Sequence, residues 1–393
     1  MNEQIVNPFD VKGANIDGNL QSIDYNKLID RFGTKRIDDI LLERIRKLTG
    51  KEPHIFLKRG LFFSHRDLNE LLDRYEMKKP FYLYTGRGPS SDNMHIGHMI
   101  PFIFCKYLQE TFNVLLVIQL TDDEKFIFNE KLTIEDVTQY SYKNIKDIIS
   151  FGFKPEKTFI FSNLEHMNSS FYKNVVKISS CISVNSSKST FGFSETDSIG
   201  KLHFVSIQAA PSFSNTFPEL FNGMIDIACL IPCAIDQDPY FRLTRDVAHK
   251  LKYLKPSLIH SKFLPALQGL NIKMSASKPN SAIFLNDTNA QIKNKINKYA
   301  FSGGGDNLEN HRKNGGNVDI DVSFQYLKFF LEDDDELNQI RINYSSGKML
   351  TGELKNKCIT ILQKKIIDMQ NIRNNITDQM IEQFTDLNYR REF

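Results

Sequence analysis

The sequence predicts an α/β protein: a Rossmann-like, doubly wound parallel sheet with an insertion, an N-terminal extension and a C-terminal helical domain. Two observations carry this prediction. Apolar segments of strand length alternate with helical segments from residue 81 to about residue 260. Beyond residue 289 the strand pattern almost disappears and helical periodicity continues. The 393 residues suffice for two or three domains, each with a sizeable core.

The first 76 residues form the predicted N-terminal extension, which is mostly helical. Residues 1–24 are polar and are typical of a loosely docked arm. Apolar residues between Ile37 and Leu48 recur at helical spacing. A short strand is expected near residues 55–62, and a further helix from Ser64.

Residues 77–288 form the predicted main domain. Its strands are expected at Phe81–Thr85, Val114–Leu120, Thr158–Ser162, Asp226–Pro232 and near Ser257–His260. Helices are expected over Thr133–Ser150 and Phe241–Leu251. Residues 164–223 are rich in Ser and Phe and interrupt the alternation, so we expect an irregular insertion between two halves of the sheet.

Residues 289–393 form the predicted helical domain. Turns are indicated by Gly303–Gly305 and by Gly315 with Gly316. An apolar stripe at spacings of three to four follows, made of Leu354, Cys358, Leu362, Ile366 and Met369.

Composition argues against several classes of protein. Net charge is +3, too mild to indicate a nucleic-acid partner by itself, so any such claim rests on local charge. The five cysteines are odd in number and lie mostly in apolar runs, which argues against a disulfide framework. Cys229 and Cys233 have no second pair nearby, which argues against a zinc site. No run reaches about 18 apolar residues and no signal-length segment opens the chain, so we expect a cytoplasmic protein with no membrane partner.

The segment from Phe81 to Thr111 has the organisation of a phosphate-binding site. A strand leads through a Gly/Pro/Ser loop into an apolar helix, whose N-terminus attracts anions. His95 and His98 flank Gly97, where a nucleotide could lie against the backbone. Taken alone, two histidines at a helix start cap or pack more often than they catalyse.

Other polar segments gain meaning from their joint placement. The loop containing Gly86 and Gly88, the acidic segment Asp122–Lys125, and Asp236 with Gln237 each follow an apolar strand. Taken alone, the glycines would indicate only a turn, the acidic segment a solvated loop, and Asp236 with Gln237 a helix cap. Loops at the carboxyl ends of parallel strands converge on one crevice, which favours a shared ligand site.

Two short motifs carry a resemblance to a known family. His95-Ile-Gly-His98 and Lys273-Met-Ser-Ala-Ser277 resemble the paired signature of class I aminoacyl-tRNA synthetases. Flanking segments resemble the eukaryotic-type tryptophanyl-tRNA synthetases: Tyr84–Ser91, Gln119–Lys125, Ile207–Ser214 and Ala234–Arg242. The resemblance extends from about Asn7 to the C-terminus. The chain departs from the common lysine-loop pattern at Ala276, which replaces its second lysine.

The resemblance implies activation of tryptophan by ATP to tryptophanyl-adenylate, then transfer to tRNA(Trp) with release of AMP and pyrophosphate. Attack on a phosphate needs positioning and charge stabilisation more than a covalent nucleophile. The implied catalytic residues are His95, His98, Lys273, Arg87 and Lys125. Mg²⁺ would accompany ATP, held by phosphate oxygens and water, with no protein-ligated metal.

The resemblance also implies two sets of binding residues. For ATP they are Gly86, Gly88, His95, Gly97, His98, Ala234, Asp236, Gln237, Lys273, Met274 and Ser275. For tryptophan they are Tyr84, Gly86, Gln119, Glu124, Phe204, Gln208 and Gln237. Tyr84 and Gln119 are carried over as readers of the indole nitrogen and Phe204 as a ring contact. The remaining polar side chains hold the ammonium and carboxylate end.

The residues alone do not separate tryptophan from tyrosine, so a tyrosyl-tRNA synthetase of the same fold remains an alternative. A non-catalytic RNA-binding or signalling relative is another, although it would be expected to have decayed motifs. The resemblance implies a homodimer with residues 164–223 at the interface, and an anticodon-binding domain over 289–393. Lysines on the C-terminal helices could contact tRNA phosphates: Lys293, Lys295, Lys298, Lys355, Lys357, Lys364 and Lys365.

Overall fold

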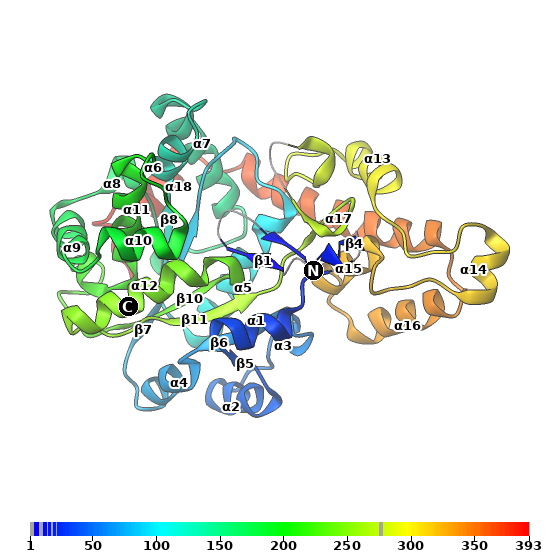
Figure 1. Cartoon of the computed structure of the whole chain (residues 1–393), viewed down its shortest axis with the longest axis horizontal. Helices are drawn as coiled ribbons and strands as arrows, with labels where there is room; N and C mark the ends of the chain where they lie inside the picture. The colour runs from blue at the N-terminus through cyan, green and yellow to red at the C-terminus, as the bar shows by residue number, and fades with distance from the viewer. Residues whose placement is uncertain are drawn as a thin grey trace.

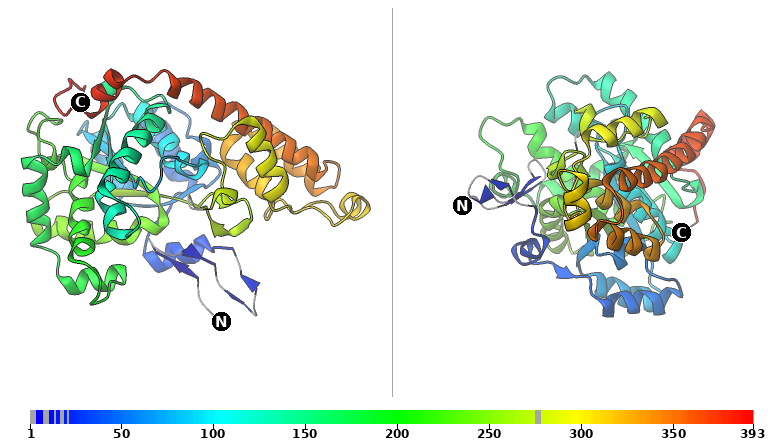
Figure 2. Two further views of the ribbon diagram at one scale, coloured as in Figure 1. Left: turned by 90° about the horizontal axis from the view of Figure 1, so that it is seen from above. Right: turned by 90° about the vertical axis from the view of Figure 1, so that its right-hand side faces the viewer.

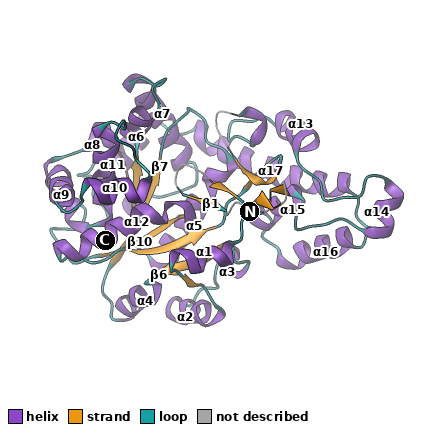
Figure 3. Cartoon of the chain, viewed as in Figure 1, coloured by secondary structure: helices purple, strands orange, loops and turns teal. Residues whose placement is uncertain are grey.

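The computed structural model describes residues 4–7, 11–13, 15–16, 19–20, 22–274 and 278–392. Its centre is a seven-stranded sheet (Figures 1 and 3). Across the sheet the strands are β5 (Lys35–Arg36), β6 (Phe62–Arg66), β11 (Ser257–Ser261), β10 (Ala228–Ala234), β7 (Phe81–Arg87), β8 (Leu116–Leu120) and β9 (Thr158–Ser162). β7 to β11 run parallel, while β6 and β5 extend one edge in antiparallel pairing. The predicted fold class is confirmed.

The strand order places a ligand crevice. The chain passes from β7 outward to β8 and β9, then returns to the other side of β7 for β10 and β11. Such a reversal opens a crevice at the carboxyl ends of the strands. Every residue of β8 and β9 is buried, because helices cover both faces of the sheet.

Three helices start or pack at this crevice: α5 (Ile96–Phe112), α7 (Ile134–Ile149) and α12 (Asp238–Leu251). α7 begins with a capping box, in which Thr133 and Asp136 accept each other's backbone N–H. α5 ends at Asn113, whose φ of 54° is the left-handed conformation that closes many helices. The expected helix over residues 133–150 is thus confirmed to within its caps.

The N-terminal region differs from the expectation in several elements. Its described elements are β1 (Ile5–Val6), β2 (Val11–Lys12), β3 (Asn15–Ile16), β4 (Asn19–Leu20), α1 (Tyr25–Phe32), α2 (Asp39–Thr49), α3 (Ile55–Lys58) and α4 (Leu68–Glu76). The strand expected near 55–62 is instead helix α3 followed by β6, and the helix expected from Ser64 begins at Leu68. The polar residues of β6 make it look unlike a buried strand in the sequence. In the fold Ser64 is buried, with its Oγ 3.0 Å from His260 Nδ1.

The segment 164–223 is helical, which corrects the expectation of an irregular insertion. It contains α8 (Asn163–His166), α9 (Ser169–Ser179), α10 (Val184–Phe191), α11 (Ile199–Ala209) and the short 3₁₀ turns η2 (Ala210–Ser212) and η3 (Ser214–Thr216). Its polar residues suggested loops, yet Asn168 and Ser183 are N-caps that accept backbone N–H groups. Phe171 and Phe217 pack edge-on against Phe161 of β9, anchoring the segment to the sheet.

Beyond the sheet the chain forms the predicted helices. They are α13 (Asn289–Tyr299), α14 (Leu308–Asn314), α15 (Val322–Phe330), α16 (Asp334–Ser345), α17 (Thr351–Asn374) and α18 (Asp378–Thr385). The predicted stripe on α17 is buried along its length. Figure 2 shows α17 running back toward the sheet, where α18 packs beside β9. None of the described helices is long and apolar enough to cross a membrane.

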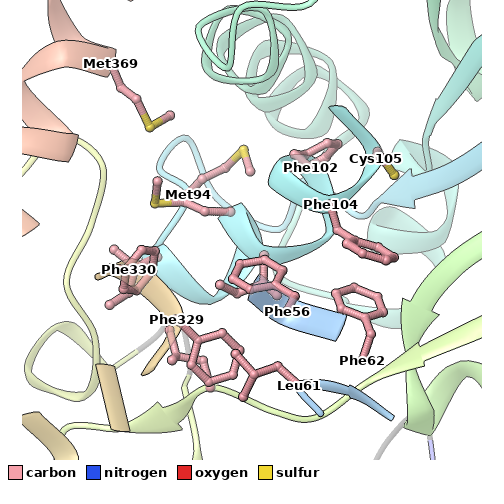
Figure 4. Close-up of a cluster of buried hydrophobic side chains, with 14 of the residues drawn as sticks. Phe56, Leu61, Phe62, Met94, Phe102, Phe104, Cys105, Phe329, Phe330 and Met369 are labelled. Atoms are coloured by element: carbon pink, nitrogen blue, oxygen red, sulfur yellow. The ribbon is translucent and has the colours of Figure 1, made fainter. Parts of the chain in front are cut away.

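One apolar core joins the sheet to the helices. Figure 4 shows the rings of Phe56, Phe62 and Phe104 together, with Phe329 and Phe330 of α15 beside them. The Phe62 and Phe104 centroids are 3.7 Å apart, and Phe56 meets Phe329 at 5.8 Å. The helical region is therefore packed against α5, whose N-terminus carries the two predicted histidines.

Candidate active site

A cavity of about 450 Å³ opens at the carboxyl ends of β7, β8 and β10. It brings together most of the predicted site residues: Tyr84, Gly86, Arg87, Gly88, His95, Gly97, His98, Gln119, Glu124, Lys125, Gln208, Ala234, Asp236, Gln237 and Met274. They come from segments that lie far apart in the chain. The topology of the sheet brings them to one place.

One predicted residue with a described side chain, Phe204, stands apart from this cavity lining. Phe204 is fully buried on α11, and its ring centroid lies 6.2 Å from that of Phe128, which does line the cavity. The backbone of Lys273 ends strand β13 (Gly269–Lys273), which pairs with β12 (Pro265–Ala266). Ser275 lies outside the described residues.

The start of α5 is built by its own two histidines. His95 is the N-cap, and its backbone N–H donates to His98 Nδ1 at 3.2 Å. The two rings stack with centroids 3.6 Å apart. A Cβ at Gly97 would lie 3.1 Å from the His95 ring and 3.2 Å from Met274 Sδ. Glycine therefore leaves room for Met274 of the lysine loop to lie directly over the helix start.

Arg87 is a buried cation that faces this helix start. Its Nε donates to Asn144 Oδ1 at 2.9 Å, and its Nη1 lies 3.1 Å from His98 Nε2. Burial lowers the pKa of Arg87 to about 10, so the guanidinium stays charged at neutral pH. Its buried Nη2 has no hydrogen-bond partner in the described part of the chain.

The contacts of the two His98 ring nitrogens indicate where its proton resides. When His98 Nδ1 accepts the His95 N–H, the proton of the neutral ring resides on Nε2, so Nε2 and Arg87 Nη1 are both donors. Two donors only 3.1 Å apart are satisfied together when one anionic oxygen accepts from both. The arrangement is therefore suited to a phosphate group.

A second charged group lies where β8 ends. Glu124 Oε1 lies 2.8 Å from Lys125 Nζ, and Glu124 Oε2 accepts from Thr121 Oγ1 at 2.6 Å. Both charged residues belong to α6 (Asp122–Phe128), a helix where the sequence suggested a loop. A Cβ at Gly88 would fall 1.9 Å from Lys125 Cε, so the glycine leaves the space that this lysine fills.

The apolar end of the cavity holds a polar pair. Tyr84 Oη lies 2.5 Å from Gln119 Oε1 and 3.0 Å from the backbone carbonyl of Gln208. Burial raises the pKa of Tyr84 well above its usual range, which keeps the hydroxyl neutral. Phe241, which is not among the predicted site residues, meets the Tyr84 ring edge-on at 6.1 Å.

The residues that hold the predicted ones in place escape sequence reasoning. Asn144 orients Arg87, Thr121 orients Glu124, and Asn163 accepts from Gln119 Nε2 at 2.8 Å. Asn144 carries a usable signal, since it lies on the apolar face of α7 beside Ile145 and is fully buried. An asparagine in an apolar stripe needs a partner. Within the described ranges, no group of three or more His, Cys, Asp or Glu residues is arranged to hold a metal ion.

Comparisons with known proteins agree with this geometry. Residues 76–365 match the family described as "tRNA synthetases class I (W and Y)". The cytoplasmic tryptophan–tRNA ligase of Schizosaccharomyces pombe is 60% identical over 384 residues, which cover 98% of this chain and 97% of that protein.

Two solved structures are also similar. The tryptophanyl-tRNA synthetase of Plasmodium falciparum is 50% identical with a TM-score of 0.89, covering 94% of this chain and 100% of that one. That of Encephalitozoon cuniculi bound to tryptophan is 46% identical with a TM-score of 0.86, covering 94% and 99%. From its fold, its site and these matches, the chain belongs to the class I tRNA synthetases of the tryptophan and tyrosine group, within the tryptophanyl-tRNA synthetases.

Proposed function

We propose that the protein is a tryptophan–tRNA ligase. It activates tryptophan with ATP, forming tryptophanyl-adenylate and pyrophosphate, and transfers the tryptophanyl group to tRNA(Trp) with release of AMP. The observation that carries this proposal is a single cavity with a neutral polar pair, Tyr84 and Gln119, at one end and the donors of Arg87 and His98 at the other. The names of the relatives support the same activity.

The phosphate end supplies charge rather than a nucleophile. His95, His98, Arg87 and Lys125 donate hydrogen bonds to phosphate oxygens of ATP as negative charge spreads in the transition state. Lys273 closes from the lysine loop over the leaving pyrophosphate, with Met274 and Ser275 beside the nucleotide. Mg²⁺ enters with ATP as part of the substrate and is held by phosphate oxygens and water.

The nucleotide itself lies across the glycines. Gly86, Gly88 and Gly97 allow close backbone approach, while Ala234, Asp236 and Gln237 border the ribose and adenine. Gly97 supports this role because the space above it is limited by His95 and Met274. A larger residue there would compete with the nucleotide.

The amino-acid end selects by polar complementarity. Tyr84 and Gln119 accept the indole N–H, and Glu124, Gln208 and Gln237 hold the ammonium and carboxylate. A tyrosine substrate has no indole N–H. Its phenol would leave a buried acceptor without a hydrogen bond, at a cost of about 1–3 kcal/mol. Phe204 backs Phe128 at 6.2 Å, so it acts on the indole through that ring.

The chain divides into an extension (1–76), a catalytic domain (77–288) and an anticodon-binding domain (289–393), with tRNA(Trp) along the last. Lys293, Lys298 and Lys364 are exposed there and support phosphate contacts. Three other candidate lysines are already in ion pairs: Lys295 with Asp287, Lys357 with Glu336 and Lys365 with Glu332. They contribute less to RNA binding.

The cytoplasm is the expected location, as it is for the named relatives.

Charging assays test the proposed function. Transcripts of tRNA(Trp) and tRNA(Tyr) are incubated with the protein, ATP–Mg²⁺ and labelled tryptophan or tyrosine. We expect labelling of tRNA(Trp) by tryptophan alone. Labelling of tRNA(Tyr) by tyrosine would favour the alternative on the same fold, and no labelling of either would favour a non-catalytic relative.

A homodimer through residues 164–223 is expected to be disrupted by Ile199→Asp. Ile199 is 83% exposed, and Tyr172, Val176 and Val184 of the same segment are also exposed. An aspartate at a buried apolar interface is strongly unfavourable. Light scattering after size-exclusion chromatography should report a dimer for the wild type and a monomer for the variant.

The matched control is Ile40→Asp, since Ile40 on α2 is 82% exposed but lies outside this segment. It should remain dimeric. A monomeric wild type, or a dimeric Ile199→Asp variant, would contradict the proposed interface.

A further inference from the structure

A chain of buried side chains extends from Tyr84 away from the cavity. Gln119 Nε2 donates to Asn163 Oδ1 at 2.8 Å, and Asn163 Nδ2 donates to Asp123 Oδ1 at 2.7 Å. Gln119 is fully buried, and Asn163 and Asp123 are at most 9% exposed. The three lie at the ends of β8 and β9, where α6 and α8 adjoin (Figure 1).

The direction of this chain is fixed by the backbone at its Asp123 end. The N–H of Glu124 donates to Asp123 Oδ1 at 2.8 Å, and a peptide N–H can only donate. At the other end Gln119 Oε1 accepts the single hydroxyl proton of Tyr84, whose oxygen lies 2.5 Å away. Each amide between them is held with its NH₂ toward Asp123 and its oxygen toward the cavity.

We propose that Asn163 and Asp123 are positioning residues that hold the Gln119 amide with its oxygen toward the ligand, so that the cavity accepts a ring N–H. This inference rests on the proposed function and deepens it. An amide of glutamine can rotate to present either group, and a rotated Gln119 would place a donor against the indole N–H. The relay through Asn163 and Asp123 removes that choice.

Protonation of Asp123 does not reverse the relay. Burial raises the pKa of Asp123 to about 7, so the carboxyl changes state near neutrality. Oδ1 accepts from both Glu124 N–H and Asn163 Nδ2, so an added proton resides on the other oxygen. Oδ1 remains an acceptor in both states, and the amides keep their direction.

The test compares tryptophan with its benzothiophene analogue, in which sulfur replaces the ring N–H. Apparent kcat/KM is measured for both amino acids by ATP–pyrophosphate exchange. For the wild type we expect tryptophan to be preferred about 10-fold to 100-fold, because the analogue leaves the buried acceptors unpaired. Asn163→Ala should reduce the preference to about 3-fold or less, mainly through the KM for tryptophan, since Gln119 is then free to rotate.

Two further variants separate positioning from a structural role. Asp123→Asn keeps an acceptor for Glu124 N–H and Asn163, and should retain the preference, whereas Asp123→Ala should lose it. Asp122→Ala is the matched control: Asp122 is also buried on α6, but its carboxylate accepts from Ser141, Ser162 and the N–H groups of Asp123 and Leu164, and not from Asn163. Its removal should lower stability and leave the preference unchanged.

The outcomes are distinguishable from a failure of the proposed function. A wild type that does not activate tryptophan overturns the function itself. A wild type that prefers tryptophan, with the same preference in Asn163→Ala or an equal loss in Asp122→Ala, overturns the relay and leaves the function standing.

Discussion

Replacing His98 with alanine is expected to lower the rate of amino-acid activation about 100-fold to 1,000-fold. The ring of His98 directs Nε2 toward Arg87 Nη1, 3.1 Å away, at the point suited to a phosphate oxygen. Alanine removes a donor whose interaction strengthens only as charge develops. Pre-steady-state formation of tryptophanyl-adenylate measures this step directly.

The fold should survive the change. His98 Nδ1 accepts one backbone N–H at the start of α5, and loss of a helix cap costs about 1 kcal/mol. His203→Ala is the control, because His203 is exposed on α11 away from the cavity lining. His98→Asn, which retains a side-chain N–H, should recover part of the rate. Unchanged activation by His98→Ala would mean that the histidine serves only as a cap.

Replacing Asp238 with alanine is expected to lower the free energy of unfolding by about 3–5 kcal/mol. Asp238 opens α12 and is fully buried, with Arg66 Nε at 2.7 Å and His260 Nε2 at 3.2 Å. Its removal leaves the Arg66 cation, whose side chain is only 13% exposed, without its carboxylate. Because Asp238 follows Gln237 directly, the loss also loosens the end of the cavity that Gln237 lines.

Denaturant unfolding of the purified variants measures this effect. The control is Asp226→Ala: its carboxylate is 73% exposed and lies 3.7 Å from Arg74. Exposed pairs contribute about 0–1 kcal/mol, so this variant should unfold close to the wild type. Equal destabilisation by both substitutions would show that burial of the Asp238 pair has no special effect.

The same carboxylate gives stability a pH dependence. Burial favours the neutral acid, but the hydrogen bonds from Arg66 and His260 outweigh it and lower the pKa of Asp238 to about 2. A folded-state pKa below the unfolded value stabilises the protein above about pH 4, by about 2 kcal/mol, and the contribution is lost as pH falls toward 2. Wild type should therefore lose stability over this interval more steeply than Asp238→Ala.

The parts of the site that could be predicted are those whose residues lie close together in the sequence. A strand, a glycine loop and a helix start are continuous in the chain, so the sequence alone groups Arg87, His95 and His98. The sheet rule then places the ends of β8 and β10 at the same edge. The cavity lining bears out that grouping for most of the residues.

The remaining parts depend on contacts between distant segments. Asn163 holds Gln119 across two adjacent strands, and no local pattern around Asn163 indicates that partner. β6 escaped prediction because its Ser64 and His65 are polar yet buried, satisfied only once β11 lies alongside. The helices of the insertion escaped because serine and asparagine caps resemble loop residues in the sequence.

The most direct test of the central claim is ATP–pyrophosphate exchange by the wild-type protein against each of the twenty amino acids. The cavity predicts exchange dependent on tryptophan and at least about 100-fold weaker with tyrosine, because its buried acceptors suit an indole N–H. Exchange driven by tyrosine and not by tryptophan, or no exchange with any amino acid, would contradict it.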